Sequence, residues 1–357
     1  MIPASLSQLI QERSSKLASS RITIGLDGFV DTVVRVVKNK QNTTSYFKTI
    51  TEFGEFTKEK GGMNFSLELE ERFSKSGGNA PIMGQALARL GASVTVIGAL
   101  GYPELHPVFS SLKTEMPVAS YANPGLSTAM EFQDGKILLA QMSELNQADW
   151  TTIRERVGIE SLQRHFNNQS MYALVNWSEL DHATSMWRGI LEEVVRTASS
   201  QKPIGFFDLA DCTRREPNAI QEILEIIRQF GKFWKVVLGV NKNEARVLYN
   251  AMTHHTSDDL YHIGAELYQL LEIDCLVIHH SREGLGWNQA GSVIVPAQLV
   301  VDPLISTGAG DNFNAGLAAG LLMDLNLEQC LMLGHAVAGA YMQQGESCRL
   351  TELLNLN

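Results

Sequence analysis

Short apolar runs alternate with helical patterns along most of the chain. The runs are rich in Val, Ile and aromatic side chains, as is typical of buried strands. They cover residues 21–26, 92–100, 171–177, 203–209, 234–240 and 275–279. Because helical stretches separate these runs, the pattern predicts an α/β fold in which a mostly parallel central sheet is covered by helices on both faces, a three-layer sandwich.

Two of the intervening helices carry clear sequence signals. In residues 217–230, Pro217 suits the first helical position, one face is apolar, and Gly231 is expected to form a left-handed C-terminal cap. Residues 80–90 are also amphipathic and are followed by Gly91. We therefore predict helices at both places.

Two stretches interrupt the alternation. Residues 32–73 are polar and mixed, and residues 118–148 read as a hairpin that turns at Asp134 and Gly135. We expect these two stretches to form one small β lid over a core made of residues 1–31, 74–117 and 149–357. The alternative is two unrelated surface insertions.

Composition narrows the class of protein. Of the 357 residues 44% are hydrophobic and 19% are charged, as in a packed globular enzyme. The net charge is −10 and no basic block occurs, so nucleic acid is not an expected partner. No apolar run is long enough to span a bilayer, so we expect no membrane partner. The cysteines are scattered and form no C-x-x-C pair, which fits a cytoplasmic protein: Cys212, Cys275, Cys330 and Cys348.

The candidate chemistry is concentrated in residues 306–316, S-T-G-A-G-D-N-F-N-A-G. Gly308, Ala309 and Gly310 let the backbone approach a ligand, and Asp311 follows at the expected start of a helix, where free N–H groups favour a phosphate. An Asp at that place can accept a proton from a hydroxyl group.

Other interpretations of this segment are weaker or remain open. It could be a Gly-rich turn in which Thr307 caps the helix and Asp311 only complements the helix dipole. A dinucleotide-binding turn is excluded, because Phe313 stands where the third glycine is required. A Walker A loop is excluded because no G-K-[ST] occurs in the chain.

The segment resembles the C-terminal signature of the ribokinase-like (PfkB) carbohydrate kinase family. Further stretches in the right order are similar to other marks of that family, and together they span residues 21–345: Asp31 after the first strand, S-G-G-N-A at residues 76–80 with A-L-A-R-L-G at 86–91, and N-K-N-E at 241–244.

The resemblance implies a role for each matching position. Asp311 would be the catalytic base, and the N–H groups that follow Gly308, at Ala309, Gly310 and Asp311, would form an anion hole. The nucleotide side would include Asn241, Glu244, Gly284 and Thr307, with Glu244 close to Mg²⁺ through water. The sugar side would include Asp31, Gly77, Gly78 and Asn79, and Asp27 is an equally polar candidate for the same pocket.

Taken alone, several of these marks have simpler explanations. Asn241 and Glu244 form a capping-box pattern, the Gly77-Gly78 pair is a tight turn, and Asp31 could cap a strand. The order of the marks along the chain is what favours the kinase interpretation.

The sequence departs from the family pattern at four positions. Ile305 replaces an Asp that is often linked to a monovalent cation site, so a cation requirement does not carry over. His279 and Ser281 replace a T-x-G pair, and Ile82 replaces an Asn that often contacts the substrate. Some nucleotide and sugar contacts are therefore expected to differ.

The sequence thus predicts an ATP- and Mg²⁺-dependent kinase that phosphorylates a hydroxymethyl group of a sugar-like small molecule. One alternative is a nucleoside kinase of the same family, in which lid aromatics such as Tyr46, Phe47, Phe53 or Phe56 stack a base. Another is a binding sensor without turnover. A homodimer joined through the lid is a further hypothesis.

Overall fold

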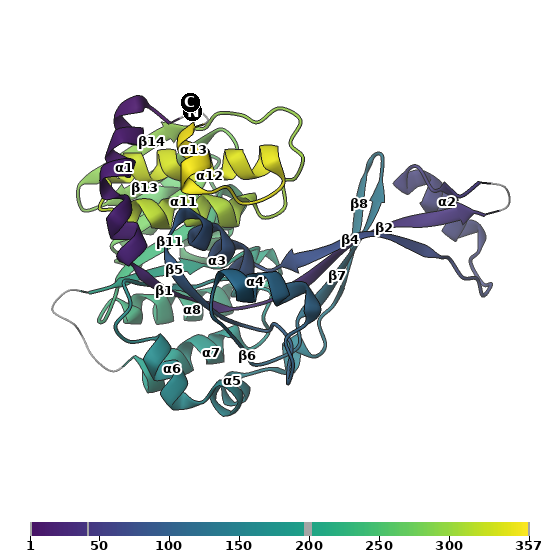
Figure 1. Ribbon diagram of the computed structural model, residues 1–357, viewed down its shortest axis with the longest axis horizontal. Helices are drawn as coiled ribbons and strands as arrows, with labels where there is room; N and C mark the ends of the chain where they lie inside the picture. Colours follow the sequence, from purple (N-terminus) through teal and green to yellow (C-terminus); the bar gives the residue numbers. More distant parts are fainter. Residues whose placement is uncertain (1, 41–42, 196–201, 356–357) are drawn as a thin grey trace.

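The computed structural model describes residues 2–40, 43–195 and 202–355 (Figure 1). It shows a three-layer α/β core from which a narrow β lid projects. The predicted α/β fold is therefore confirmed. Among the described helices, none is long and apolar enough to cross a membrane.

The large sheet of the described chain has nine strands. Seven are parallel, and a hairpin is added antiparallel at one edge. In spatial order the strands are β14 (Gly291–Pro296), β13 (Glu283–Asn288), β12 (Cys275–His279), β11 (Lys235–Asn241), β10 (Ile204–Asp208), β9 (Met171–Leu174), β1 (Arg21–Leu26), β5 (Ser93–Gly98) and β6 (Val118–Ser120).

Helices cover both faces of this sheet, and each face has its own apolar cluster. One layer consists of α1 (Ala4–Ser19), α3 (Asn79–Leu90), α4 (Ser110–Glu115), α11 (Ala309–Leu322), α12 (Leu327–Gln344) and α13 (Leu350–Asn355). The other consists of α5 (Trp150–Val157), α6 (Ile159–His165), α7 (Ala183–Gly189), α8 (Pro217–Phe230), α9 (Lys242–Thr253) and α10 (Leu260–Leu271). Burial on both faces explains why the strands are near-continuous apolar runs.

The helix predicted for residues 217–230 is α8, but its predicted cap is wrong. Gly231 has φ −57° and ψ −16°, which is right-handed rather than left-handed backbone. The chain tightens into a further turn, in which the N–H of Gly231 donates to the Arg228 carbonyl oxygen and that of Phe233 to the Phe230 carbonyl oxygen. At the end of α3, by contrast, Gly91 is left-handed at φ 112°.

The lid is a small sheet that extends away from the core in Figure 1. Its strands are β2 (Phe29–Asn39), β3 (Ser45–Tyr46), β4 (Leu69–Gly77), β7 (Gly125–Phe132) and β8 (Gly135–Gln141), and α2 (Ile50–Glu59) packs near its tip. Strands β7 and β8 form the hairpin expected around Asp134 and Gly135. Strand β2 pairs with β4 on one side and, in parallel, with β7 on the other, so both insertions form one sheet.

The sequence predicts that residues 32–73 and 118–148 form the lid and that the rest forms the core. This division of the chain stays a prediction. The lid strands β2 and β4 run past the first range at both ends, to Phe29 and Gly77. Residues 118–120 form β6, which pairs with β5 in the large sheet. The apolar alternation continues through these junctions, so composition alone does not mark them.

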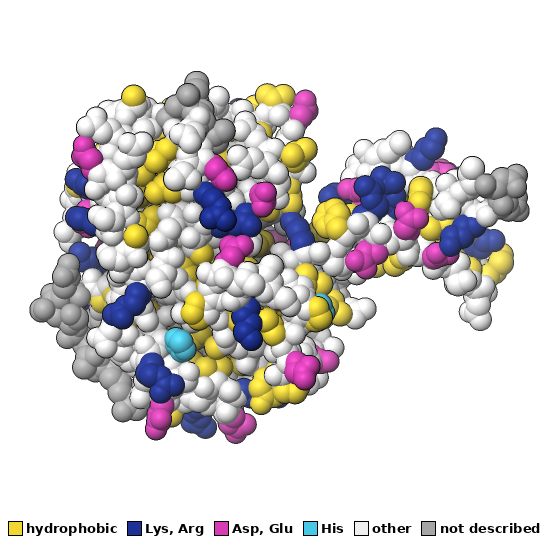
Figure 2. Space-filling view, viewed as in Figure 1, with side chains coloured by type: hydrophobic (Ala, Val, Ile, Leu, Met, Phe, Trp, Pro, Cys, Tyr) yellow, Lys and Arg dark blue, Asp and Glu magenta, His cyan; other side chains and the backbone are white. Residues whose placement is uncertain are grey.

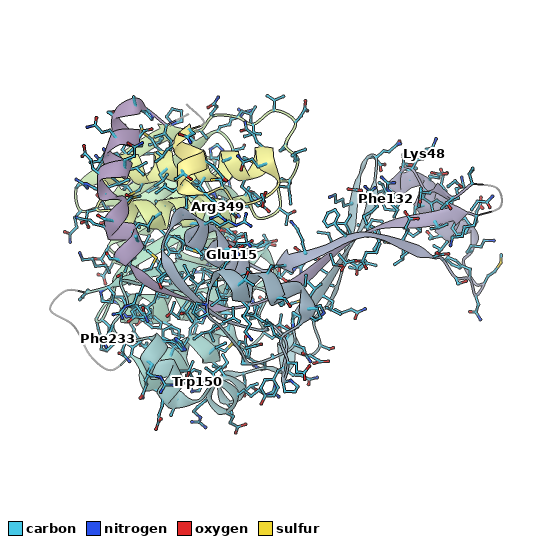
Figure 3. The ribbon with its side chains drawn as sticks, in the orientation of Figure 1. Lys48, Glu115, Phe132, Trp150, Phe233 and Arg349 are labelled. Atoms are coloured by element: carbon cyan, nitrogen blue, oxygen red, sulfur yellow. The ribbon has the colours of Figure 1, made fainter. Side chains whose placement is uncertain are left out.

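The lid has a hydrophobic cluster separate from those of the core. Val34, Val36, Phe47, Met130 and Phe132 are buried there, and side chains of α2 pack against them. Figure 3 labels Phe132 and Lys48 in this part of the lid, far from Trp150 in the core. The space-filling view in Figure 2 shows that side chains of both charge signs cover the lid surface.

Candidate active site

The carboxyl ends of the parallel strands bring polar residues to one edge of the large sheet. Asp27 follows β1, Asn176 lies two residues after β9, and Asp208, Asn241 and His279 end β10, β11 and β12. In open α/β sheets ligands bind at this edge. Helices α3 and α11 begin above it.

Helix α11 begins at the Gly-rich segment found in the sequence. Gly308 is its N-cap residue with φ 91°, so Thr307 does not cap the helix. A Cβ on Gly308 would lie 2.8 Å from the Tyr341 hydroxyl and 3.3 Å from the Ile82 side chain. That hydroxyl donates to the Thr307 carbonyl oxygen at 2.8 Å. Tyr341, far along the chain in α12, therefore supports the turn.

Asp311 lies in the first turn of α11 and is only partly exposed. Burial raises the pKa of its carboxyl group well above the usual range, and repulsion by Asp208, Asp27 and Glu244 raises it further. Since the protonated form is favoured by these surroundings, the carboxylate is a stronger base than a solvated Asp.

The three N–H groups predicted to form an anion hole differ in whether they already have a hydrogen-bond acceptor. The Ala309 N–H donates to the Ser306 carbonyl oxygen at 3.1 Å, and the Asp311 N–H interacts with its own carboxylate. The Gly310 N–H has no hydrogen-bond acceptor among the residues described. This group and the dipole of α11 remain free for a phosphoryl oxygen.

Asp27 anchors the start of α3. Its buried carboxylate accepts hydrogen bonds from the N–H groups of Asn79 (2.7 Å) and Ala80 (2.8 Å) and from the Asn176 amide (2.7 Å). Burial raises its pKa to about 6, against the effect of these donors. Asp27 thus fixes Gly78 and Asn79, and a contact of Asp27 with sugar stays a prediction.

Asp31 lies four residues later, on β2 at the base of the lid. A Cβ on Gly77 would lie 2.5 Å from the Asp31 carboxylate, so only glycine leaves this space open. Burial raises the pKa of Asp31. Both Asp31 and Asp311 contribute to the raised pKa of the Tyr341 phenol, about 12, after burial. Asp31 and Asp311 are therefore both close enough to the Tyr341 phenol to affect its pKa.

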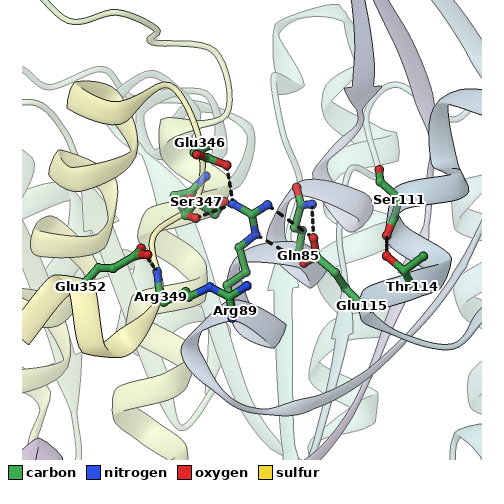
Figure 4. Close-up of polar contacts among 10 residues, drawn as sticks. Gln85, Arg89, Ser111, Thr114, Glu115, Glu346, Ser347, Arg349 and Glu352 are labelled. Carbon is green, nitrogen blue, oxygen red and sulfur yellow. Dashed lines mark hydrogen bonds and ion pairs between the residues drawn. The ribbon is translucent and has the colours of Figure 1, made fainter.

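Arg89, near the end of α3, begins a polar network, and Figure 4 draws its contacts with Glu346 and Ser347. Arg89 of α3 donates to Glu346 and to the Ser347 carbonyl oxygen, both at 2.8 Å. The Ser347 hydroxyl donates to buried Asn312, whose amide donates to the Gly308 carbonyl oxygen. The end of α3 is thereby linked to the start of α11.

Asn241 and Glu244 form the capping box that the sequence suggested. The Asn241 side chain accepts from the N–H groups of Asn243 and Glu244, and Glu244 accepts from the Asn241 N–H at 2.7 Å. The Glu244 side chain is also buried. Burial raises its pKa to about 8, and repulsion by Asp208 adds to that rise.

Asp208 is the buried last residue of β10. Its carboxylate accepts from the Ala210 N–H (2.7 Å) and the Asn314 amide (2.5 Å), while nearby Arg214 pairs with Glu179 at 3.8 Å. Burial raises the pKa of Asp208 to about 6. No pattern in the sequence indicates the contact between Asp208 and Asn314, which are 106 residues apart.

A cavity of about 490 Å³ adjoins the start of α11. Its walls include Asn241, His279, His280, Gly310, Phe313 and His335. His279 stacks on Phe313 with ring centroids 4.5 Å apart. Burial lowers the pKa of His279 to about 3 and that of His335 to about 4, so both rings are neutral near pH 7. Gly284 lies against His335: a Cβ on Gly284 would be 2.8 Å from the His335 Nε2 atom. Gly284 itself does not line the cavity.

The corner beside this cavity suits a cation bound to phosphates. Asp208, Glu244 and Asp311 all have raised pKa values, and none of them forms an ion pair with Lys or Arg among the described residues. Within the same part of the chain no group of three His, Cys, Asp or Glu residues could hold a metal by itself. Phosphate oxygens and water would have to complete the coordination of Mg²⁺.

The aromatic residues proposed to stack a nucleoside base are placed elsewhere. Phe47 packs on Phe53 and Phe56 with ring centroids 5.4 and 5.1 Å apart, inside the cluster of the lid. Tyr46 donates to Glu70. These aromatic residues stabilise the lid. Tyr46 and Phe47 also line a cavity of about 460 Å³ within the lid, together with Lys48 and Phe132, but this cavity shares no lining residue with the one beside the start of α11.

Comparisons with known proteins agree with this geometry. The family model for prokaryotic ketohexokinase matches residues 4–356. A ketohexokinase from Haloferax volcanii is 28% identical over 342 residues, covering 95% of this chain and 91% of that protein. Solved structures with similar folds include adenosine kinase from Sinorhizobium meliloti (TM-score 0.66, 17% identity, 94% of this chain and 98% of that one) and a variant of phosphofructokinase-2 from Escherichia coli (TM-score 0.65, 14% identity, 94% and 98%).

Proposed function

The chain belongs to the prokaryotic ketohexokinase family, and from this premise we propose that it transfers the γ-phosphoryl group of ATP to a hydroxymethyl group of a ketohexose. Membership makes it a sugar kinase, a phosphotransferase with an alcohol as acceptor. The ketohexose is the substrate that the name of the Haloferax relative indicates.

One observation carries the proposal: the turn at Gly308 that begins the helix of Asp311 packs against Ile82 of α3, and Asp31 lies over Gly77 just before α3 begins. A sugar held by Asp31 through its hydroxyl groups would place a further hydroxyl toward Asp311. The turn at Gly77 and Gly78 gives the sugar access to the backbone at the start of α3, and Asn79 would add an amide contact.

In the proposed mechanism Asp311 accepts the proton of the attacking hydroxyl group. The Gly310 N–H and the start of α11 stabilise the charge that develops on the transferred phosphoryl group. The Ala309 and Asp311 N–H groups would join them once their present contacts open. Positioning of the two reactants accounts for much of the remaining acceleration.

We place ATP in the cavity beside His279, with its phosphates toward Gly310. Asn241 and Glu244 would orient water around Mg²⁺, and Thr307 lies at the entrance to the same turn. When bound, Mg²⁺ neutralises phosphate charge during transfer. The uncompensated carboxylates Asp208 and Glu244 support a cation there.

Two alternatives remain testable. The fold similarity to adenosine kinase keeps a nucleoside kinase in view, although the lid aromatics are packed together. The changed positions His279, Ser281 and Ile305 motivated a sensor without turnover, and the convergence of Asp31 and Asp311 weighs against it.

The test is ADP release with Mg-ATP across ketohexoses, aldohexoses, pentoses and nucleosides, for the wild type and Asp311→Asn. We expect turnover on a ketohexose, and a loss of about 10²- to 10⁴-fold in kcat in the variant. Turnover on nucleosides alone would establish the first alternative. Ligand binding without ADP release from any substrate would establish the second.

We also propose that the lid joins two copies of the chain. Apolar side chains of β4 and β8 are exposed, among them Phe73, Leu138 and Leu139 at 49%, 68% and 52%. Such strands at a sheet edge favour pairing. Sedimentation of the wild type and Leu138→Glu should show a dimer that the variant weakens, and a monomeric wild type would refute the proposal.

A further inference from the structure

A row of polar side chains crosses the base of the lid. Asp31 of β2 is the direct cross-strand partner of Lys75 on β4 and of Ser127 on β7. Directly opposite residues project from the same face of a sheet. Glycines and Phe29 form the next row toward the core, and apolar residues, including Phe73 and Val33, form the next row toward the tip.

Lys75 and Asp31 face each other without a direct contact. Among the described residues, neither side chain forms a hydrogen bond or an ion pair within 4 Å, although both are only partly exposed. Burial lowers the pKa of Lys75, while Asp31 raises it and Lys136 lowers it. Two partly desolvated charges without partners are costly in a folded protein. A ligand that satisfies both would remove that cost.

The side chains of Asp31, Lys75 and Ser127 project from the face of the lid that is directed toward the reacting groups. Asp31 acts on the Tyr341 phenol together with Asp311, and its carboxylate lies over Gly77, next to the start of α3. The opposite face of the same strands carries the contact between Thr32 and Ser74, which are on the surface of the lid. Lys75 is thus on the sugar side of the lid.

An ammonium group and a carboxylate read different atoms of a sugar. Asp31 can only accept hydrogen bonds and therefore binds hydroxyl donors, whereas Lys75 can only donate. Hydroxyl groups can satisfy either residue, but an oxygen without a proton satisfies only Lys75. A ketose has such an oxygen, the carbonyl oxygen in the open form or the ring oxygen in the cyclic form.

Building on the proposed function, we propose that Lys75 is a specificity-determining residue, which donates a hydrogen bond to the ring or carbonyl oxygen of the ketohexose while Asp31 accepts from its hydroxyls. The site then distinguishes a ketohexose from the hexitol obtained by its reduction, because the hexitol has no ring or carbonyl oxygen and its open chain does not hold a hydroxyl oxygen fixed at that position. Ser127, on the other side of Asp31, is a neutral donor or acceptor for a further hydroxyl.

The test is calorimetric binding of D-fructose and of D-mannitol, with a non-hydrolysable ATP analogue present, to the wild type, Lys75→Met and Lys75→Arg. We expect Lys75→Met to weaken fructose binding by about 10- to 100-fold, as for a hydrogen bond to a charged group. Mannitol binding should change far less, so the preference for the ketose should collapse. Lys75→Arg should restore part of it.

Lys136→Met is the matched control, because Lys136 lies on β8 of the same lid and interacts electrostatically with Lys75. It should leave both affinities within about twofold, which is below a lost hydrogen bond to a charged group. Equal effects of Lys75→Met and Lys136→Met, or equal losses for the two sugars, would overturn the proposal.

Measurements from about pH 4.5 to 8, which begin just above the ordinary pKa of an Asp, separate a direct contact from an effect through Asp31. Lys75 lowers the pKa of Asp31, so its removal raises that pKa. If Lys75 acted only through Asp31, the loss of affinity in Lys75→Met would fade as the pH rises and Asp31 ionises in both proteins. A direct hydrogen bond predicts a constant loss.

Turnover assays on the same proteins keep the two proposals distinct. Lys75→Met should raise KM for fructose and leave kcat and the KM for ATP nearly unchanged. If the wild type binds fructose through Lys75 but releases no ADP, the kinase proposal fails and the Lys75 proposal stands. If it turns over fructose and Lys75→Met binds it normally, only the Lys75 proposal fails.

Discussion

Replacement of Gly77 by Ala tests whether the position of Asp31 limits catalysis. A Cβ at residue 77 would lie 2.5 Å from both Cγ and Oδ2 of Asp31, and ordinary contacts begin at 3.4 Å. The backbone itself would tolerate Ala, because Gly77 is not among the glycines with positive φ. The carboxylate must therefore move by about 0.9 Å.

A displacement of this size is large for a group that orients a substrate. A misplacement of about 1 Å can reduce the rate of a positioned reaction by about 10²-fold. We expect Gly77→Ala to lower kcat/KM for a ketohexose by roughly this factor. Among the described residues the Asp31 side chain has no hydrogen bond or ion pair to lose by moving, so the melting temperature should change little.

The assay is steady-state ADP release with the sugar varied, alongside thermal unfolding. Gly54→Ala is the control, because Gly54 lies in α2 of the same lid and has no atom within 4 Å of its added Cβ. Gly54→Ala should keep full activity. Wild-type kcat/KM in Gly77→Ala, with its melting temperature unchanged, would show that Asp31 does not need its present position.

Further predictions concern charge, nucleotide binding and the lid. Because the folded-state pKa of Asp311 is raised, its contribution to stability is present below about pH 4 and is lost as the pH rises through that pKa. Urea unfolding should therefore show Asp311→Asn more stable than the wild type at pH 8 and equal to it near pH 4. A stability difference that grows on acidification would contradict this pH dependence. His279→Ala removes a ring stacked on Phe313 in the cavity and should raise KM for ATP about 3- to 10-fold with the sugar KM unchanged; an equal rise for both substrates would place His279 outside the nucleotide site. Phe47→Ala removes the centre of the lid cluster, which should lower the stability of the lid by about 3–5 kcal/mol. The lid should become sensitive to limited proteolysis, and the KM for the sugar should rise. A large fall in the temperature of the main melting transition would show instead that lid and core unfold together.

The core of the fold could be predicted from the sequence because it depends on local patterns. Strands buried on both faces are continuous apolar runs, and β1 and β12 begin and end where those runs do. The start of α11 was also predictable, because the small residues 308–310 followed by Asp311 are typical of a helix start that binds an anion. The right-handed Gly231 was not, because its conformation depends on the turn that follows.

The partners of the site residues could not be predicted, because they come from distant segments. Asp27 and Asp31 are equivalent in a linear pattern, and only the fold shows that Asp27 anchors α3 while Asp31 lies on β2 at the base of the lid. Lys75 was missed for a similar reason: strand register, which no local pattern fixes, sets it opposite Asp31. Tyr341 supports residues 307 and 308 from another helix.

The parallel pairing of β2 with β7 also has a consequence for synthesis on the ribosome. Strands β2 and β4 can pair as soon as residue 77 has emerged, but β7 begins only at residue 125. At about 5–20 residues per second, this interval lasts roughly 2–10 s. During that time one edge of β2 has no partner strand, so the incomplete lid of a nascent chain can pair with that of another chain being synthesised on the same mRNA.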